Sequence, residues 1–187
     1  MFQNKTRCSW CNSSKKYQKY HDEEWGKPVY DDAIFFEFLV LETFQAGLSW
    51  ITILNKRENF RKALDNFDYK KIANYSDDKI QDLLQDTGII RNKLKIYSTA
   101  TNAQNFIKIQ EEFGSFTKYI WNYVEGKPIV NLPKKHSDVT ATTLLSDKIS
   151  NDLKKRGFKF VGSTVIYAFM QATGIVNDHI EDCFMKN

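Results

Sequence analysis

The stretch FFEFLVLETFQAGLSW, Phe35–Trp50, decides the fold that we predict for this chain. Its apolar residues recur at helical spacing, and one face of the predicted helix carries Phe35, Leu39, Glu42 and Ala46. Glu42 is therefore a carboxylate on an otherwise apolar stripe, where an unpaired charge is costly. We expect Glu42 to sit at the edge of the stripe, to pair with an arginine such as Arg57 or Arg61, or to face a bound ligand.

The residues that follow this helix predict a sharp corner. Gly47 can end the helix with a positive φ, Ser49 can cap the next helix, and Trp50 stands between the two. A carboxylate and an indole beside one helix corner suit a pocket for a flat ligand that is cationic or rich in N–H groups.

The composition indicates a globular protein of modest positive charge. Of the 187 residues, 42% are apolar, enough for one domain (1–187) or for two small helical lobes that share a core. No run approaches the roughly 20 apolar residues of a membrane span, and the N-terminus lacks the apolar core of a signal peptide. We therefore expect a soluble, cytoplasmic protein without a membrane partner, and a monomer. The net charge of +4 permits an acidic partner.

Helix-start and helix-stop residues recur along the chain and predict an all-α fold of about eight or nine helices joined by short loops. We expect helices near residues 15–25, 31–46, 49–64, 76–87, 91–107, 115–124, 146–157 and 163–172. The segment Ser163–Ala172 lacks a polar face and predicts full burial. A last helical turn after Asp178 would carry His179 and Cys183. No segment has the alternation of a strand.

Cysteines and histidines near the two ends of the chain suggest a metal site. On a helix, His179 and Cys183 would lie one turn apart, which suits two ligands of one metal. Cys8 and His21 supply a second pair, and a Cys2His2 set fills a tetrahedral, structural zinc site. Alternatively, Cys8 and Cys11 form a C-x-x-C knuckle that leaves His21 free, or the thiols and histidines are simply buried apart.

The segment LLQDTGIIRNKLKI, Leu83–Ile96, predicts two helices joined by a tight turn that contains Gly88. Glycine lets another backbone come close, and the amides after it, at the start of a helix, favour an anion. Because Arg91, Lys93 and Lys95 follow directly, we expect this hairpin to hold a DNA phosphate. The alternative is an ordinary helical hairpin with a solvated basic face.

Six segments resemble the 3-methyladenine DNA glycosylase I family in order and spacing. They are RCSW (7–10), YHDEEWG (20–26), LETFQAGLSWITILNKRENFR (41–61), DTGIIRNKLKI (86–96), LKKRGFKFVGSTVIYAFMQATG (153–174) and VNDHIEDC (176–183). The similarity spans roughly residues 7–183 and is weakest over 110–145. It implies a helix–hairpin–helix base-excision glycosylase whose N-terminal segment, about 1–30, is tied to the C-terminus by a structural zinc.

The resemblance also implies which residues form the site. The zinc ligands would be Cys8, His21, His179 and Cys183, with Cys11 outside. The 3-methyladenine pocket would be formed by Glu42, Tyr20 and Trp50, with Trp10 stacking nearby and Tyr17 and Trp25 lining it. The DNA contacts would come from the hairpin, through Gly88, Ile89, Arg91 and Lys93.

The expected chemistry is hydrolysis of a glycosidic bond after the base has left the helix. The turn Gly47–Leu48 is the expected wedge into double-stranded DNA. Aromatic rings would favour the cationic base, and Glu42, the catalytic residue, would complement the charge of that base. Free 3-methyladenine would be the product. No lysine is placed as a nucleophile, so we expect an enzyme without lyase activity. Two other hypotheses are a DNA-lesion-binding protein without catalysis and a zinc-stapled interaction module.

Overall fold

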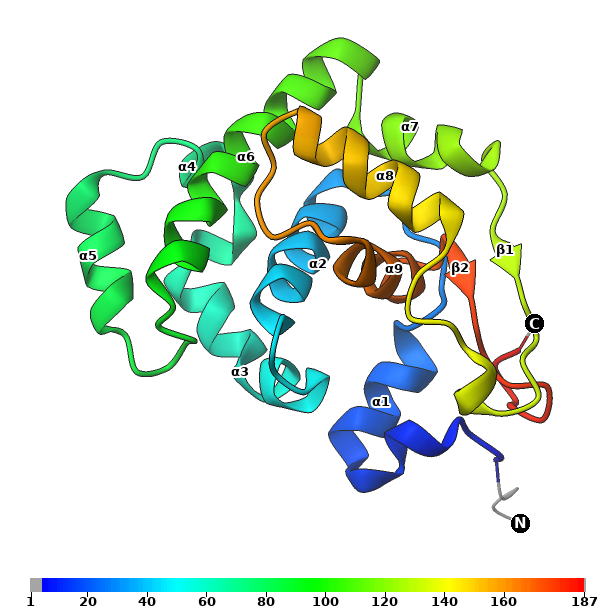
Figure 1. Ribbon diagram of the computed structural model, residues 1–187. Coiled ribbons are helices and arrows are strands. Elements are labelled where there is room, and N and C mark those ends of the chain that lie inside the picture. The colour runs from blue at the N-terminus through cyan, green and yellow to red at the C-terminus, as the bar shows by residue number, and fades with distance from the viewer. Residues whose placement is uncertain (1–4, 187) are drawn as a thin grey trace.

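The computed structural model describes residues 5–186, and this part of the chain folds into nine α-helices with two very short strands (Figure 1). The helices are α1 (Lys15–Glu23), α2 (Asp32–Gln45), α3 (Trp50–Ala63), α4 (Tyr69–Ile72), α5 (Asp77–Gln85), α6 (Lys93–Phe113), α7 (Phe116–Trp121), α8 (Leu144–Lys155) and α9 (Ser163–Ala172). The predicted predominance of helices is confirmed, and so is their number within the described residues.

Helix α2 lies at the centre of the molecule and contacts α3, α6, α7 and α9 (Figure 1). It is buried on almost every side from Phe35 to Phe44, so the single apolar stripe predicted for it was too narrow. The helix ends at Gln45, and Ala46, expected on the buried face, is exposed. Gln45 and Ala46 therefore stand at the surface end of a helix whose other turns form the core.

The start of α2 is fixed by two aspartates with different tasks. The helix expected from residue 31 is capped by Asp31, whose carboxylate accepts from the amides of Ala33 and Ile34 at 2.8 and 3.1 Å. Asp32 instead accepts from the amides of Phe116 and Thr117, at 2.9 and 2.8 Å. It thereby caps α7, which lies more than 80 residues away in the chain, and locks α2 to it.

The C-terminal third differs from the prediction in two places. The helix expected near residues 146–157 begins earlier, at Leu144, because Thr143 caps α8 and forms a reciprocal capping box with Ser146. The segment that follows α9 is not a helix: it forms the strand β2 (Val176–Asn177), parallel to β1 (Ile129–Val130), and then turns. The helix predicted for the residues after Asp178 is therefore wrong: β2 ends directly before Asp178, and the described residues that follow form turns.

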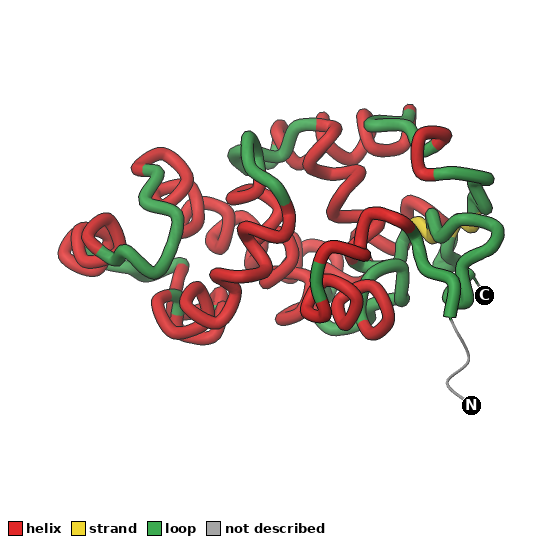
Figure 2. Tube along the Cα trace, turned by 90° about the horizontal axis from the view of Figure 1, so that it is seen from below, coloured by secondary structure: helices red, strands yellow, loops and turns green. Residues whose placement is uncertain are grey.

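The two ends of the described chain meet at one end of the molecule. The amide of Phe184 donates to the carbonyl of Thr6 at 3.0 Å. The strands β1 and β2 lie towards the opposite end of the molecule from α5 (Figure 1 and Figure 2). Among the described residues, no helix has the length and apolarity needed to cross a membrane.

The connection between α5 and α6 covers residues 86–92 and is longer than the tight turn predicted. It is docked on α3: Lys56 Nζ donates to the carbonyls of Thr87 and Gly88 at 3.2 and 3.0 Å. Gly88 does not adopt a positive φ. A Cβ atom there would instead meet Asp86 Oδ1 at 2.9 Å and Asn59 Cβ at 3.3 Å, so glycine lets these two side chains pack closely.

Candidate active site

A cavity of about 190 Å³ opens between α1, α2, α9 and the start of α3. Its lining consists of Trp10, Tyr17, Tyr20, Trp25, Glu42, Gln45, Trp50, His136, Ala168 and Gln171. A single water needs only about 10–15 Å³ of such space, so this cavity has room for a much larger group. All six residues expected in the base pocket line it.

Glu42 is the buried acid of this cavity. Its side chain is 3% exposed, and Oε2 has no hydrogen-bond partner within the described residues. Burial raises the pKa of this carboxyl to about 8, because the charged form is poorly solvated there. The expectations that Glu42 sits at the edge of the stripe or pairs with an arginine are therefore both wrong.

The two arginines considered for Glu42 pair with other acids. Arg57 binds Glu37 and Glu24, each at 2.6 Å. Arg61 donates to Glu37 at 2.8 Å and to Glu58 at 2.6 Å. Among residues 5–186, the cavity carboxyl is thus left without a counter-ion.

Two aromatic side chains face this acid across the cavity. The rings of Tyr20 and Trp50 lie 5.3 Å apart, and both residues are more than nine-tenths buried. Trp50 Nε1 is buried without an acceptor in the described part of the chain. Burial raises the pKa of Tyr20, so its hydroxyl stays neutral at physiological pH. An unpaired N–H and an unpaired carboxyl oxygen therefore line one cavity, where a ligand with both kinds of group would satisfy them.

A second aromatic group, carried by the N-terminal segment, completes the wall. Trp10 packs edge-on against Tyr17 and Trp25, with ring centroids 4.9 and 5.0 Å apart. Trp25 in turn contacts the ring of His179 at 4.6 Å, and Trp10 contacts that of His21 at 5.4 Å. The cavity wall is therefore built directly on the cysteine–histidine cluster.

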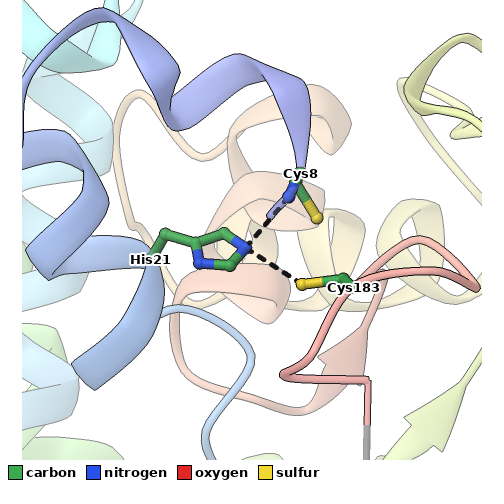
Figure 3. Close-up of side chains that lie close together, drawn as sticks. All are labelled: Cys8, His21 and Cys183. Atoms are coloured by element: carbon green, nitrogen blue, oxygen red, sulfur yellow. Dashed lines mark hydrogen bonds between the residues drawn. The ribbon is translucent and has the colours of Figure 1, made fainter. Parts of the chain in front are cut away.

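Three of the four expected metal ligands converge behind that wall (Figure 3). The ligand atoms of Cys8, His21 and Cys183 all lie within 4.8 Å of one another, and all three residues are buried. His21 Nε2 faces Cys183 Sγ at 3.4 Å. Two sulfurs and an imidazole nitrogen are the donors that zinc prefers.

The fourth expected ligand, His179, lies beside His21, with ring centroids 4.9 Å apart. Its Nδ1 contacts Asn177 Oδ1 at 2.8 Å, and its Nε2 is buried without a partner among the described residues. Because an amide oxygen can only accept, Nδ1 carries the proton and Nε2 keeps its lone pair. An orphaned lone pair beside the cluster fits a fourth metal ligand.

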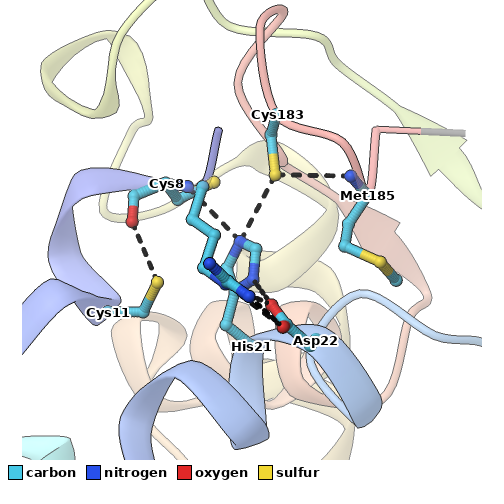
Figure 4. Close-up of polar contacts among 7 residues, drawn as sticks. Cys8, Cys11, His21, Asp22, Cys183 and Met185 are labelled. Carbon is cyan, nitrogen blue, oxygen red and sulfur yellow. Dashed lines mark hydrogen bonds and ion pairs between the residues drawn. The ribbon is translucent and has the colours of Figure 1, made fainter. Parts of the chain in front are cut away.

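Surrounding groups hold the cluster in this arrangement (Figure 4). His21 Nδ1 contacts Asp22 Oδ1 at 2.8 Å, and Arg7 binds the same carboxylate at 2.7 Å. Such outer carboxylates fix the ring of a metal-binding histidine. Cys11 instead points its thiol to the carbonyl of Cys8, 3.1 Å away, and does not join the cluster. This geometry favours the Cys2His2 hypothesis over the C-x-x-C knuckle.

A second hollow of about 220 Å³ adjoins the cavity and shares Glu42, Gln45 and Ala168 with it. It is bordered by Gly47 and Leu48, the residues between α2 and α3. Gly47 has φ +84°, as predicted for the helix end, and Leu48 is 40% exposed. A large apolar side chain thus stands at the surface next to the cavity mouth.

Comparison with known proteins decides the family. The model of a family described as methyladenine glycosylase matches residues 10–186. The chain belongs to the methyladenine glycosylase family. It is 44% identical to DNA-3-methyladenine glycosylase 1 of Escherichia coli (strain K12), over 95% of both chains. It is also 44% identical to DNA-3-methyladenine glycosylase of Haemophilus influenzae, over 97% of this chain and 98% of that one.

Solved structures agree with this assignment. A crystal structure of 3-methyladenine DNA glycosylase I superposes with a TM-score of 0.93 at 44% identity, covering 96% of this chain and 99% of that chain. A variant of 3-methyladenine DNA glycosylase I in complex with 3-methyladenine gives a TM-score of 0.94 at 35% identity, covering 97% of each chain.

In this methyladenine glycosylase, four cavity residues escaped the sequence analysis: Gln45, His136, Ala168 and Gln171. Ala168 and Gln171 lie on the less buried face of α9, together with Thr164. Full burial of α9 was therefore wrong. The spacing of Thr164, Ala168 and Gln171 by four and three residues is the signal that could have marked this face. His136 carried no signal beyond that of a surface histidine.

The hairpin of this methyladenine glycosylase only partly matches its prediction. Ile89 has a buried side chain, and its amide donates to the carbonyl of Asp86 at 3.4 Å. The next two amides, of Ile90 and Arg91, have no acceptor within residues 5–186. Arg91 and Lys93 are exposed beside them. Lys95 is buried, so the expectation that its side chain helps to hold a DNA phosphate is wrong.

Proposed function

We propose that this methyladenine glycosylase hydrolyses the N-glycosidic bond of 3-methyladenine in alkylated double-stranded DNA. The observation that carries the proposal is that one cavity contains two polar atoms without hydrogen-bond partners among the described residues, the acceptor Glu42 Oε2 and the donor Trp50 Nε1. Both are buried polar atoms without a partner in the described chain, and a flat base with N–H and acceptor groups would satisfy them.

Charge explains why a methylated base is chosen. Methylation at N3 makes the adenine ring cationic, which weakens its bond to the sugar. The rings of Tyr20 and Trp50 stabilise a cation by about 0.5–2 kcal/mol. The buried carboxyl of Glu42, whose pKa is about 8, gains a counter-ion when the cation enters and then ionises. Unmodified adenine lacks the charge and is rejected chiefly for that reason.

The DNA is held at two places. Leu48 enters the duplex beside the cavity and replaces the base that has flipped out. The helices α5 and α6, with the connection 86–92 between them, act as a helix–hairpin–helix. This element binds a phosphate through the amides of Ile90 and Arg91, and the side chains of Arg91 and Lys93 add positive charge. The enzyme acts as a monomer.

A zinc ion bound by Cys8, His21, His179 and Cys183 is structural in this proposal. All four positions are taken by protein, so no water is activated there. The metal fastens the segment that carries Trp10 and Tyr20, and hence shapes the cavity wall.

The decisive experiment is mass analysis of bases released from methylated duplex DNA by the wild type and by Glu42→Gln. We expect wild-type release of 3-methyladenine and a loss of at least a hundredfold in kcat/KM for the variant, since removing one electrostatic group costs about that much in other enzymes. Binding of methylated DNA by the wild type with no base released would instead indicate a lesion-binding protein.

The proposal also specifies hydrolysis without strand cleavage. No Schiff base should form, so borohydride should trap no covalent enzyme–DNA adduct. A trapped adduct would contradict a monofunctional enzyme.

A further inference from the structure

A buried aspartate behind the cavity collects three hydrogen bonds. Asp178 is 2% exposed. Its Oδ1 accepts from Asn131 Nδ2 at 2.7 Å, and its Oδ2 accepts from the Tyr167 hydroxyl and from Gln171 Nε2, each at 2.7 Å. Asp178 itself does not line the cavity, but Gln171 does. The aspartate therefore contacts a cavity residue from behind.

This contact fixes which end of the Gln171 amide is available. A carboxylate only accepts hydrogen bonds, so the amide nitrogen of Gln171 must face Asp178. The amide oxygen is then turned the other way, and within residues 5–186 it accepts no hydrogen bond. Gln171 consequently offers the cavity an acceptor rather than a donor.

The adenine base has a matching group. In 3-methyladenine the exocyclic amine carries the only N–H groups, whereas N1 and N7 are acceptors. In 3-methylhypoxanthine a carbonyl oxygen replaces that amine, so an acceptor in the cavity would face another acceptor. A site built to bind an N–H group rejects analogues that lack it, because its own polar group is left unpaired.

We propose that Gln171 is a specificity-determining residue, which accepts a hydrogen bond from the exocyclic amine, and that Asp178 is the positioning residue that orients its amide. This inference rests on the proposed function, since it assumes that the cavity holds 3-methyladenine. It adds an adenine-selecting contact on α9 to the charge-selecting contacts on α1, α2 and α3.

The test compares two ligands that differ at this group, free 3-methyladenine and free 3-methylhypoxanthine, by calorimetry on the full chain. Gln171→Met keeps the length of the side chain but removes the acceptor. We expect it to weaken 3-methyladenine binding roughly three- to tenfold, the loss of about one hydrogen bond, and to leave 3-methylhypoxanthine unchanged or tighter. The ratio of the dissociation constant of 3-methylhypoxanthine to that of 3-methyladenine therefore falls.

Asp178→Asn tests the positioning role. An asparagine can donate to Gln171 Oε1, so the amide can reverse and present its nitrogen to the cavity. The same ratio should fall at least as far as in Gln171→Met. Asn131→Ala is the matched control: it removes another donor to Asp178 but leaves the Gln171 contact, so the ratio should stay at the wild-type value.

The outcomes separate the inference from the function. If the wild type releases 3-methyladenine from DNA and Gln171→Met keeps the wild-type ratio, the specificity role is overturned and the function stands. If Gln171→Met lowers the ratio and a folded Asp178→Asn does not, the positioning role is overturned. If the wild type releases no 3-methyladenine, the proposed function fails, and the inference fails with it.

Discussion

The ammonium group of Lys95 donates to the carbonyl oxygen of Ala46 at 2.7 Å and to that of Phe44 at 2.9 Å. Lys95 lies in the first turn of α6, close after the connection 86–92, and is 5% exposed. The two carbonyls are at the end of α2, directly before Gly47 and Leu48. A positive charge at a helix C-terminus is favourable. Here the Lys95 contact also links the proposed phosphate-binding hairpin to the proposed wedge at Leu48.

Replacing Lys95 by Met should loosen this joint. Two charge-assisted hydrogen bonds are lost, so we expect the free energy of unfolding to fall by about 1.5–3 kcal/mol. The kcat/KM for excision from duplex DNA should fall further than the affinity for free 3-methyladenine. The residues that line the cavity are unchanged, whereas the segment that carries Leu48 loses its contact with Lys95. Lys93→Met, an exposed neighbour, is the control for stability. Equal losses in excision and in free-base binding would contradict the positioning role of Lys95.

Leu48→Ala tests the wedge itself. Unstacking costs a few kcal/mol per base step, so loss of the apolar wedge should reduce kcat/KM on duplex DNA roughly ten- to a hundredfold. The affinity for free 3-methyladenine should change little. The control is Leu144→Ala, since Leu144 is 89% exposed and is not among the residues that line the cavity. A similar effect of both substitutions would count against the wedge.

The activity should depend on pH through Glu42. Burial raises the pKa of Glu42 to about 8, so the ionised fraction in the free enzyme rises about tenfold per pH unit below that value. We expect kcat/KM on methylated DNA to rise with pH and to level off above about pH 8. The residual activity of Glu42→Gln should lack this limb. A profile that is flat between pH 6 and 8 in the wild type would contradict a role for the ionised carboxyl.

The same group should destabilise the unliganded protein as the pH rises. Its pKa is near 4.3 in an unfolded chain and about 8 in the folded one, so the folded state holds the extra proton between these values. Stability therefore falls across this window, by on the order of 1 kcal/mol per pH unit. Chemical denaturation at several pH values should show Glu42→Gln becoming more stable than the wild type as the pH rises. A difference independent of pH would contradict the raised pKa.

Metal content distinguishes the two ligand hypotheses. We expect about one zinc per chain in the wild type and a large loss in Cys183→Ser, together with a loss of folding free energy of several kcal/mol. Cys11→Ser should retain the metal, because the Cys11 thiol binds the carbonyl of Cys8 and stands outside the cluster. Elemental analysis of the purified variants gives the answer. Loss of zinc in Cys11→Ser with retention in a His21 variant would favour the C-x-x-C knuckle.

The sequence by itself determined what depends on neighbours along the chain. The sequence predicted the helix starts at residues 31, 76 and 115, because the side chains of Asp31, Ser76 and Ser115 bind amides within three residues of them. The end of α2 at Gly47 was readable for the same reason. Burial of Glu42 followed from its apolar surroundings on α2, and the ordered motifs carried the family.

The tertiary structure decided everything that depends on contacts between distant segments. Lys95 was expected to bind a phosphate. Because α6 packs against the end of α2, the ammonium group of Lys95 instead binds carbonyls at the end of that helix. The strand β2 pairs with β1 and ends directly before Asp178, and no helix follows it in the described residues. Only the position of Asp178 fixed the amide of Gln171. A linear pattern records the chemistry of each side chain, whereas its partner is set by which surfaces the folded chain brings together.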